Sequence, residues 1–465
     1  MILPEIFSRR MMKMLDKEYD DFQQSFNNEL VTTIRINSDK FTDKPPLDRV
    51  AYCETGFFVP KRPVFTIDPF FHSGVYYVQE SSSMFLEQAM KSVVTKSDIT
   101  VLDLCAAPGG KSTHLASILP NESLLVSNDV IRTRSQILSE NLRKWGKPNV
   151  IVTNNDPHDF QRLPDFFDLL VIDAPCSGEG LFRRDENAVH EWSPENAQLC
   201  SKRQQRILAD VWPTLKVGGV LIYSTCTFNP AENEENIQWL NDFADIEPVT
   251  LGIADNWGIT VTDAGGFPCY RFYPHKVSGE GFFMAVVRKV GKSDSSPMKK
   301  FKENPLQASK AEKEIGKSLF SDERLDILRF EDSLLAFPLL HISELLQIKN
   351  NLRIIHAGVK IGELKHNDLI PAHELALSTI LKRSAFPEID LTIEVAISFL
   401  KREDISPQSV NKGWNLITYR NKPLGWVKNL GNRFNSAFPK EWRIRMSVSE
   451  FRDERLKAEI LKFPL

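Results

Sequence analysis

The sequence predicts an α/β protein built around a doubly wound sheet, with smaller domains on either side of it. Short apolar runs alternate with helical patterns from about Gly74 to Lys289, which is typical of strands joined by helices. A glycine-rich turn follows the first of these strands, and acidic residues stand at the ends of later strands. Both features are typical of the ligand-binding edge of such a sheet.

The expected elements of the sheet follow in chain order. Five apolar runs are predicted strands: residues 100–104, 123–127, 150–153, 169–173 and 219–223. Four amphipathic stretches are predicted helices: residues 111–119, 133–145, 194–215 and 231–243. The β-branched run GFFMAVVRK at residues 281–289 predicts a late strand at the edge of the sheet.

The length of 465 residues predicts about two to four domains. Residues 1–72, with a helical pattern at 16–26 and a strand pattern at 32–38, form an N-terminal domain, and residues 73–290 form the sheet domain. The lysine- and serine-rich residues 291–317 read as a linker. Residues 318–390 predict a small α+β domain, and residues 391–465 predict a second one.

Composition excludes several classes of protein. Apolar residues make up 42% and charged residues 26%, as in soluble globular proteins, and no apolar run is long enough to cross a bilayer. The N-terminus does not resemble a signal peptide. The six cysteines are scattered without a CxxC pair, which predicts neither a metal site nor disulfides and fits a cytoplasmic protein: Cys53, Cys105, Cys176, Cys200, Cys226 and Cys269.

Basic residues gather near the C-terminus, within residues 412–445. Glu441 is the one acidic residue of this segment. The basic residues are Lys412, Arg420, Lys422, Lys428, Arg433, Lys440, Arg443 and Arg445. Aromatic residues lie among them, and we expect about two-thirds of these to belong to the core of a small β domain. The charge predicts a polyanionic partner for this end of the chain.

The stretch DLCAAPGGKST at residues 103–113 looks like a phosphate-binding loop but does not fit its pattern. The first glycine of that pattern would fall on residue 105, which is Cys105. Asp129 follows the glycine pair by about twenty residues, where such sheets place the acid that binds ribose hydroxyls. Asp156 follows the third strand, in a position to meet an adenine edge. The pattern favours a ligand of the adenosine type.

Two cysteines follow strands of the predicted sheet. DAPCSG at residues 173–178 contains Cys176, and YSTCT at residues 223–227 contains Cys226. A single cysteine at the end of a strand is usually a small packing residue. Two such cysteines beside an acid and a cofactor loop instead predict chemistry that uses a thiolate.

Four motifs resemble those of the NOL1/NOP2/sun family of RNA (cytosine-5)-methyltransferases: LDLCAAPGGKSTHLAS, SNDV, VIDAPCSGEGLFRRD and YSTCTFNPAENEENI. They extend from about Tyr77 to Lys289 in the order and spacing of that family. The resemblance implies S-adenosylmethionine in the crevice and a Rossmann-like methyltransferase sheet. Asp129 would hold the ribose, with Asp156 and Asp173 along the adenine and reaction side. The loop residues implied to line the cofactor are Cys105, Ala106, Ala107, Pro108, Gly109, Gly110 and Lys111.

The same resemblance implies roles for the reactive residues. Cys226 would add to carbon 6 of the cytosine, Asp173 would support the addition, and Cys176 would assist release of the product. DNA cytosine-5 methyltransferases use the cysteine of a Pro-Cys pair as nucleophile. If this chain followed them, Cys176 and Cys226 would exchange roles, which the motifs around both cysteines disfavour.

The C-terminal run PLGWVKNLGNRFNSAFPKEWRIR resembles the end of a PUA-type RNA-binding domain. The order of domains resembles bacterial enzymes that methylate small-subunit (16S) ribosomal RNA, with an N-terminal domain of RNA-binding type. The expected partner is therefore ribosomal RNA or the 30S subunit, bound by a monomer, without DNA or membrane. Two alternatives remain: a tRNA cytosine-5 methyltransferase, and a non-catalytic ribosome-assembly factor. A pure RNA binder would not need Cys226, Cys176 and Asp173 together.

Overall fold

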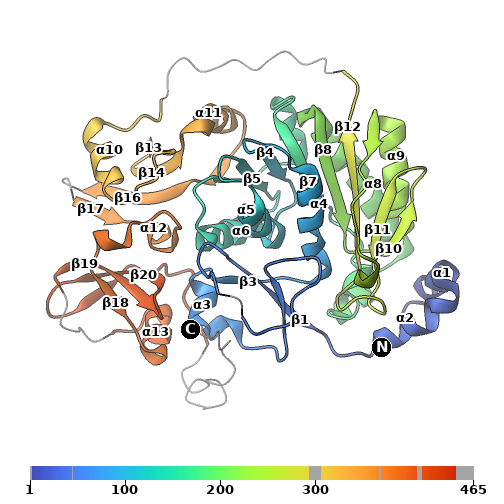
Figure 1. Ribbon diagram of the computed structural model, residues 1–465, viewed down its shortest axis with the longest axis horizontal. Helices are drawn as coiled ribbons and strands as arrows, with labels where there is room; N and C mark the ends of the chain where they lie inside the picture. The colour runs from blue at the N-terminus through green and yellow to red at the C-terminus, as the bar shows by residue number, and fades with distance from the viewer. Residues whose placement is uncertain (1–2, 44, 293–304, 366–367, 406–410, 447–465) are drawn as a thin grey trace.

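The α/β class predicted from the sequence is confirmed. The computed structural model describes residues 3–43, 45–292, 305–365, 368–405 and 411–446. Within these residues the strands form a three-stranded, a ten-stranded and two four-stranded sheets (Figure 1). In the described part of the chain, no helix combines the length and the apolar character needed to span a membrane.

The ten-stranded sheet has a parallel centre in the order β6-β5-β4-β7-β8. Its parallel strands are β4 (Thr100–Asp103), β5 (Leu124–Asn128), β6 (Val150–Thr153), β7 (Phe167–Asp173) and β8 (Leu215–Thr225). All five overlap the predicted strands. From β4 the chain builds outward through β5 and β6, and then returns to place β7 on the other side of β4. This reversal of order creates a switch point between β4 and β7, where ligands of such sheets bind.

The prediction that residues 281–289 form an edge strand is wrong. These residues form β12 (Phe282–Lys289), which pairs antiparallel with β8 on one side and with β11 (Pro268–Phe272) on the other. β10 (Thr260–Asp263) then forms the edge, and β9 (Ile246–Pro248) also pairs with β12. The strands outside β12 are short and partly polar, so they lack the apolar run that reveals a buried strand.

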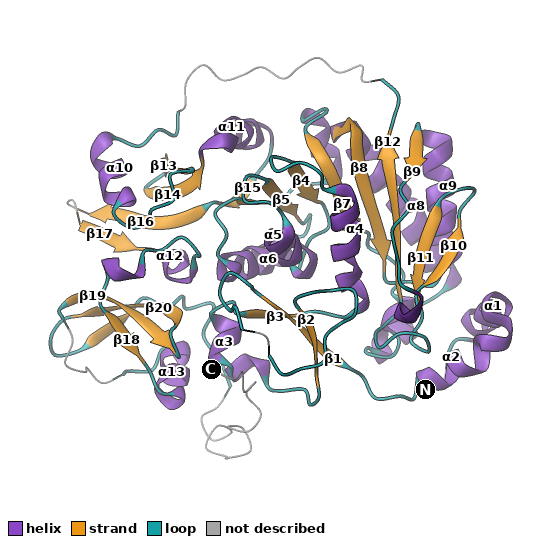
Figure 2. Cartoon of the chain, in the orientation of Figure 1, coloured by secondary structure: helices purple, strands orange, loops and turns teal. Residues whose placement is uncertain are grey.

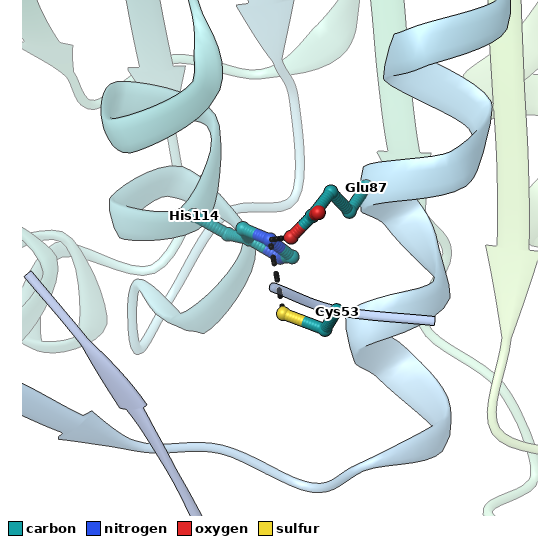
Figure 3. Close-up of side chains that lie close together, drawn as sticks. All are labelled: Cys53, Glu87 and His114. Carbon is teal, nitrogen blue, oxygen red and sulfur yellow. Dashed lines mark hydrogen bonds and ion pairs between the residues drawn. The ribbon is translucent and has the colours of Figure 1, made fainter. Parts of the chain in front are cut away.

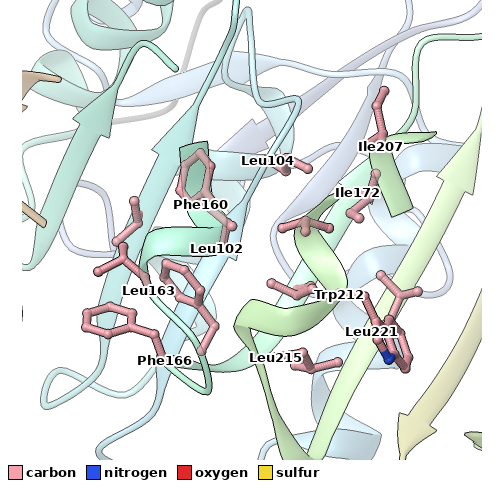
Figure 4. Close-up of a cluster of buried hydrophobic side chains, with 14 of the residues drawn as sticks. Leu102, Leu104, Phe160, Leu163, Phe166, Ile172, Ile207, Trp212, Leu215 and Leu221 are labelled. Carbon is pink, nitrogen blue, oxygen red and sulfur yellow. The ribbon is translucent and has the colours of Figure 1, made fainter. Parts of the chain in front are cut away.

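Helices cover both faces of the sheet (Figure 2). Neighbouring residues of β4 point to opposite faces, so Val101 joins one apolar core and Leu102 joins the other. On the side of Val101 lie α4 (Leu86–Val93), α5 (Gly110–Ile118) and α6 (Arg132–Trp145). On the side of Leu102 lie α8 (Pro194–Val211), α9 (Glu234–Phe243) and α11 (Ile342–Asn351). Figure 4 shows part of this second core, which includes Leu102 and Ile172 of the sheet and Ile207 of α8.

Helix α8 illustrates how local sequence positions a functional side chain. Ser193 caps the helix by accepting a hydrogen bond from the backbone N–H of Asn196 at 3.1 Å, and Pro194 occupies the first turn. The buried residues of α8 recur at helical spacing, and Gln204 lies in the middle of this buried face. The amide of Gln204 therefore points toward the sheet rather than toward solvent.

The N-terminal residues form two parts. Helices α1 (Glu5–Leu15) and α2 (Tyr19–Ser25) pack against the sheet domain, where Phe7 contacts the rings of Phe182, Trp192 and Phe228. The rest folds as a three-stranded sheet with one short helix: β1 (Thr32–Ile36), β2 (Gly56–Val59), β3 (Tyr76–Val78) and α3 (Pro69–His72). The predicted strand at 32–38 is present, and α1 is a helix that the sequence analysis did not predict.

The middle domain has a sheet of β13 (Leu325–Phe330), β14 (Ser333–Pro338), β16 (Val359–Lys365) and β17 (Asp368–Pro371). It is not a separate unit, because β15 (Ile354–Ala357) pairs with β6 and extends the central sheet. The prediction of a linker to residue 317 is wrong for its last part. Residues 310–317 form helix α10 (Lys310–Lys317), closed by a capping box of Ser309 and Glu312. Residues 293–304 lie outside the described residues.

The C-terminal sheet begins at β18 (Glu388–Asp390), slightly before the predicted boundary at residue 391. The sheet continues with β19 (Gly413–Tyr419), β20 (Lys422–Asn429) and β21 (Phe434–Ser436), and α13 (Ile393–Lys401) packs on it. Ile417 and Val427 of this sheet share one apolar core with Ile34 and Phe70 of the N-terminal domain. The N-terminal and C-terminal sheets therefore lie side by side, as Figure 1 also shows near α3. Residues 447–465 lie outside the described residues.

Candidate active site

The loops predicted to carry the site leave the sheet at its switch point. Asp103, the last residue of β4, lies opposite Val171 in the neighbouring β7. Asp173, the last residue of β7, lies opposite Ser224 in β8. The three strands are parallel, so the glycine-rich loop after Asp103 and both cysteine loops emerge at the same edge.

Two side chains of α6 hold the backbone of the glycine-rich loop. Arg134 donates a hydrogen bond to the carbonyl oxygen of Ala107 at 2.6 Å. Asn141, two turns further along the helix, donates to the carbonyl oxygen of Pro108 at 2.8 Å. These two hydrogen bonds hold the backbone of residues 107 and 108 in place beside the strand ends.

Gly109 is required by the conformation of this loop. Its φ angle is +116°, a region that side chains other than glycine rarely adopt, and an added Cβ would lie 3.3 Å from Leu138. Helix α5 begins at the next residue, Gly110, so its first backbone N–H groups have no partner within the helix. These donors at the start of α5 suit the negatively charged carboxylate of an amino-acid group.

The N-terminal sheet supports the same loop through Arg35, which is fully buried. The guanidinium donates hydrogen bonds to Gln79 Oε1 at 2.8 Å and to Thr113 Oγ1 in α5 at 2.5 Å. It also lies 4.7 Å from the ring centre of Trp145 in α6. Burial lowers the pKa of Arg35 to about 10. Arg35 thus ties β1 to both helices that frame the glycine-rich loop, a role that the sequence analysis did not predict.

Asp103 lies beneath the loop and is fully buried. Its Oδ2 accepts a hydrogen bond from the hydroxyl of Ser112 at 2.6 Å, whereas its Oδ1 has no hydrogen-bond partner. Burial raises the pKa of Asp103 to about 7, and the nearby Asp173 and Asp129 add to this effect. Three carboxyl groups therefore converge on this edge of the sheet. Such an edge suits a ligand that carries a positive charge.

Lys111 forms an ion pair rather than a free phosphate clamp. Its Nζ lies 2.7 Å from Oδ2 of Asp173 and 5.1 Å from the ring centre of Phe282. The other oxygen of Asp173 accepts a hydrogen bond from the hydroxyl of Ser224 at 2.8 Å. Lys111 and Ser224 thus orient the carboxylate of Asp173 beside the cysteine loops.

The other two acids predicted to bind the cofactor differ in their surroundings. Asp129 is buried at the end of β5, and its Oδ1 accepts a hydrogen bond from the N–H of Ile131 just before α6. Asp156 is partly exposed, and both of its oxygens accept hydrogen bonds from Arg206 of α8, at 3.1 and 2.9 Å. Oδ2 of Asp129 lies 3.6 Å from Nη2 of Arg134, the side chain that also holds the glycine-rich loop. Asp156 makes an ion pair with α8 that the sequence analysis did not predict.

The structure brings the two predicted cysteines together. The Sγ atoms of Cys176 and Cys226 lie 3.1 Å apart, although they are fifty residues apart in sequence, and both thiols are free. The N–H of Gly180 donates a hydrogen bond to the carbonyl oxygen of Cys226 at 2.8 Å, which joins the two loops. The hydrogen bond with Cys226 raises the pKa of Cys176 well above its usual value, and burial adds to this.

The four remaining cysteines do not take part in this pair. Cys105, in the glycine-rich loop, is partly buried, and burial raises the pKa of its thiol, so it acts as a small apolar lining residue. The others are buried: Cys53, Cys200 and Cys269.

Cys53 belongs to a second buried cluster, with Glu87 of α4 and His114 of α5 (Figure 3). Their potential ligand atoms all lie within 4.8 Å of one another, which makes this the group best suited to a metal within the described residues. Both oxygens of Glu87 already accept hydrogen bonds from the N–H of Glu54, and burial raises the pKa of Cys53 to about 12. Structural zinc sites use four ligands. We assign the cluster to hydrogen bonding between the N-terminal domain and α4 and α5.

The sequence analysis missed Glu232, which the structure places behind the cysteine loops. Its side chain is fully buried, and its oxygens accept hydrogen bonds from Ser177 and Gln204. In the sequence Glu232 stands in the acidic run PAENEEN, which looks like the charged first turn of a helix. The signal that sets it apart from its neighbours is burial, which sequence alone did not reveal.

The basic residues of the C-terminal sheet lie on its surface. Seven of the eight predicted positions are exposed, and Lys422 is the exception, donating a hydrogen bond to the carbonyl oxygen of Lys40. Of the six aromatic residues among them, four are buried: Tyr419, Trp426, Phe434 and Phe438. The expectation that about two-thirds of them form core is confirmed. Trp414 and Trp442 remain partly exposed.

Comparison with known proteins agrees with this architecture. The family model described as 16S rRNA methyltransferase RsmB/F matches residues 92–288. The model of the N-terminal domain of 16S rRNA methyltransferase RsmF matches residues 3–81, and that of the methyltransferase RsmF PUA domain matches residues 386–444. A protein named ribosomal RNA small subunit methyltransferase F from Aeromonas salmonicida is 33% identical, over 91% of this chain and 93% of its own length. The protein of the same name from Escherichia coli O9:H4 is 30% identical, over 94% and 96%.

Solved structures show the same fold. A methyltransferase homolog protein from Pyrococcus horikoshii is 28% identical, with a TM-score of 0.51, over 62% of this chain and 95% of its own. NSun6 from the same organism, solved with the S-adenosylmethionine analogue SFG, is 20% identical with a TM-score of 0.52, over 62% and 99%. The second likeness concerns the fold alone.

The switch-point site on a Rossmann-like sheet defines an S-adenosylmethionine-dependent RNA methyltransferase. The chain belongs to the ribosomal RNA small subunit methyltransferase F family, since it matches relatives of that name over nearly their whole length. The resemblance of its motifs to the NOL1/NOP2/sun family is confirmed as well.

Proposed function

We propose that this protein transfers a methyl group from S-adenosylmethionine to carbon 5 of a cytosine in small-subunit ribosomal RNA. The observation that carries the proposal is the pair of free thiols, Cys176 and Cys226, 3.1 Å apart beside the glycine-rich loop. Methylation of oxygen or nitrogen atoms has no need of a thiol nucleophile, whereas a carbon of a pyrimidine ring does. The names of the relatives supply the class of RNA.

The residues at the strand ends fit S-adenosylmethionine. The unpartnered Oδ1 of Asp103 and the buried carboxyl group of Asp129 lie beside the loop of residues 105–111, where positive charge and ribose hydroxyls would find acceptors. The free N–H groups at Gly110 would face the carboxylate of the methionine part. When bound, S-adenosylmethionine supplies an electrophilic methyl group on a sulfonium sulfur. Asp156 and Cys105 are proposed to complete the pocket.

Cys226 is proposed to be the nucleophile. Its thiolate sulfur forms a bond to carbon 6 of the cytosine, and the electron pair of the 5,6 double bond moves toward carbon 5. Carbon 5 thereby becomes electron-rich enough to accept a methyl group. Asp173, oriented by Lys111 and Ser224, supports the addition by hydrogen bonding to the N3/N4 edge of the ring.

Cys176 is proposed to act in the release of the product. After methylation, the proton on carbon 5 is removed by a base, the electron pair restores the 5,6 double bond, and the bond to Cys226 breaks as its thiolate leaves. The Sγ of Cys176 lies 3.1 Å from that of Cys226, next to the bond that must break. The hydrogen bond with Cys226 raises the pKa of Cys176, which disfavours Cys176 as the thiolate and so disfavours an exchange of the two roles.

Nucleoside analysis tests this proposal. The purified protein is incubated with S-adenosylmethionine and either naked 16S ribosomal RNA or 30S subunits, and the digested RNA is examined by mass spectrometry. We expect 5-methylcytidine with the wild-type protein and none with Cys226→Ala. The control is Cys200→Ala, which removes a buried thiol of α8 outside the pair and should retain activity. A methylated nucleoside other than 5-methylcytidine, or full activity of Cys226→Ala, contradicts the proposal.

A further inference from the structure

Two thiols at one site raise the question of which of them reacts. Cys176 and Cys226 are both partly buried, both follow parallel strands, and their sulfur atoms are in contact. Only one proton needs to leave such a pair to give a thiolate, and each sulfur competes for the proton that remains. Which sulfur becomes the thiolate must be decided by groups that lie nearer to one sulfur than to the other.

Glu232 is such a group, because its contacts flank Cys176 on both sides in the sequence. Its Oε1 accepts a hydrogen bond from the backbone N–H of Ser177 at 2.8 Å, and its Oε2 accepts one from the hydroxyl of Ser177 at 2.5 Å. Gln204 donates to Oε1 of Glu232 at 3.1 Å and to the carbonyl oxygen of Pro175 at 3.0 Å. The residue after Cys176 is therefore bonded directly to this carboxylate, and the residue before Cys176 is linked to it through Gln204.

The link from Glu232 to the loop of Cys226 is less direct. It runs through Ser177, whose hydroxyl oxygen lies 3.0 Å from that of Thr227. Since Ser177 donates its hydroxyl proton to Glu232, Thr227 acts as the donor in this contact. The carboxylate of Glu232 thus links the two loops, but its direct hydrogen bonds include one to the backbone of the loop of Cys176.

Burial raises the pKa of Glu232, whereas the hydrogen bonds from Ser177 and Gln204 lower it and favour the ionised carboxylate. All three hydrogen bonds to its side chain come from donors, which suits an acceptor that carries no proton. In the described part of the chain no ion pair connects it to an arginine, lysine or histidine. Its charge is therefore not cancelled locally, and in a dry site it acts strongly on nearby groups.

We propose that Glu232 is a positioning residue that selects Cys226 over Cys176 as the nucleophile, by fixing the loop of Cys176 and placing a negative charge beside it. A second negative charge on Cys176 is disfavoured there, so the thiolate forms on Cys226. The role of Cys226 as nucleophile rests on the function proposed above. The preference between the thiols, however, belongs to the free protein and is measured without RNA.

The pKa of Cys176 agrees with this arrangement. It is raised well above the usual value, first by the hydrogen bond with Cys226, then by burial and by the charges of Cys226 and Glu232. The hydrogen bond acts within the pair of thiols, whereas the charge of Glu232 acts on Cys176 from outside the pair.

Alkylation of the thiols tests the proposal. The full-length protein is treated with iodoacetamide at pH 7.5, and peptide mass spectrometry gives the rate at Cys176 and at Cys226. Thiolates react and thiols do not, so we expect Cys226 to react at least about tenfold faster in the wild-type protein. Glu232→Gln keeps the size of the side chain but removes its charge. We expect this change to lower the ratio of the rates at Cys226 and Cys176 by about tenfold, the effect of one unit of pKa.

Two further variants separate charge from structure. Glu235→Gln removes an exposed charge three residues away and should leave the ratio unchanged. In Cys226→Ser, where Cys176 has lost its sulfur partner, Cys176 should remain poorly reactive, and adding Glu232→Gln should make it reactive. An unchanged ratio in folded Glu232→Gln overturns the proposal. If that variant does not fold, rapid alkylation of Cys176 in Cys226→Ser overturns it. Absence of 5-methylcytidine would count against the proposed function and would leave this ratio untouched.

Discussion

At the scale of single residues, the site contains groups with a raised pKa. Burial raises the pKa of Asp103, and the hydrogen bond with Cys226 together with burial raises that of Cys176. Asp103 is the clearest case, because it is fully buried, accepts one hydrogen bond, and has its pKa raised to about 7. A carboxyl group in this position favours its protonated form until a ligand with positive charge arrives. Asp103 can therefore accept a cationic ligand, but ionising its buried carboxyl group lowers the stability of the folded protein.

The raised pKa of Asp103 predicts that the free energy of unfolding depends on pH. The pKa of Asp103 is higher in the folded than in the unfolded protein, so the stabilisation from its bound proton is complete below about pH 4. It is lost as the pH rises to about 7. Asp103→Asn should remove this loss, which amounts to roughly 2–4 kcal/mol in the free energy of unfolding. Urea unfolding at pH 5 and pH 8 measures the change.

A control for this prediction lies just before the same strand. Asp98 is exposed, and Asp98→Asn should leave the difference between pH 5 and pH 8 as in the wild-type protein. If Asp103→Asn also retains the wild-type difference, the carboxyl group of Asp103 is not the source of the pH dependence.

The residues that could be predicted from sequence were those whose neighbours along the chain reveal them. Cys176 and Cys226 stand in distinctive motifs directly after apolar strands, and the structure places their sulfur atoms 3.1 Å apart. Glu232 and Arg35 could not be predicted, because nothing near them in sequence shows that they are buried. Their partners, Ser177 and Thr113, are 55 and 78 residues away.

At the scale of elements, the glycine-rich loop depends on a strand outside the sheet domain. Arg35 of β1 reaches α5 through Thr113 and lies against Trp145 of α6. The N-terminal sheet therefore braces the two helices that frame the glycine-rich loop. The N-terminal domain is therefore part of the structural unit that contains the site.

Arg35→Leu tests this brace. The change leaves Gln79 and Thr113 without their charged partner inside a buried contact, which costs about 2–4 kcal/mol in the free energy of unfolding. We also expect the affinity for S-adenosylmethionine to fall by about tenfold, because the start of α5 is released. Calorimetric titration with S-adenosylmethionine measures the affinity. Arg9→Leu, at an exposed position of α1, should bind as the wild-type protein does. Equal affinities in both variants would show that β1 does not position the loop.

The strands of the sheet were predictable where they are apolar and parallel. β4 to β8 are buried on both faces, so their sequences are continuous apolar runs. Among the antiparallel strands, β12 was predicted from its apolar run, but β10 and β15 were not. β10 alternates between partly buried and exposed residues, and β15 reaches the sheet from the middle domain. Pairing between segments far apart in sequence leaves no local pattern.

At the scale of the whole molecule, the N-terminal and C-terminal sheets pack together. Ile34 of the N-terminal sheet and Ile417 of the C-terminal sheet belong to the same apolar core. The exposed basic residues of the C-terminal sheet are therefore held in a fixed relation to the active site. A rigid arrangement of this kind can position a cytosine while the flanking RNA is bound elsewhere.

Salt dependence tests this basic surface. The triple change Lys428→Gln, Arg433→Gln and Arg443→Gln removes three exposed charges from the C-terminal sheet. If each contacts a phosphate, the slope of log affinity against log salt should fall by about 2–3, since each contact contributes about 0.7–0.9. Filter binding of 16S ribosomal RNA at several salt concentrations measures the slope.

A matched triple change elsewhere completes this test. Lys96→Gln, Lys310→Gln and Lys317→Gln remove three exposed charges outside the C-terminal sheet. The slope should then remain close to that of the wild-type protein. Equal slopes for the two triple variants would show that the C-terminal sheet is not the main contact with phosphates.

The central claim is that Cys226 bonds to carbon 6 of a cytosine while Cys176 assists release. Peptide mass spectrometry of the Cys176→Ala variant, after incubation with S-adenosylmethionine and 16S ribosomal RNA, tests it most directly. We predict a covalent adduct that survives denaturation and maps to Cys226, with a methylated pyrimidine attached. An adduct on any other residue, or turnover at the wild-type rate without an adduct, would contradict the claim.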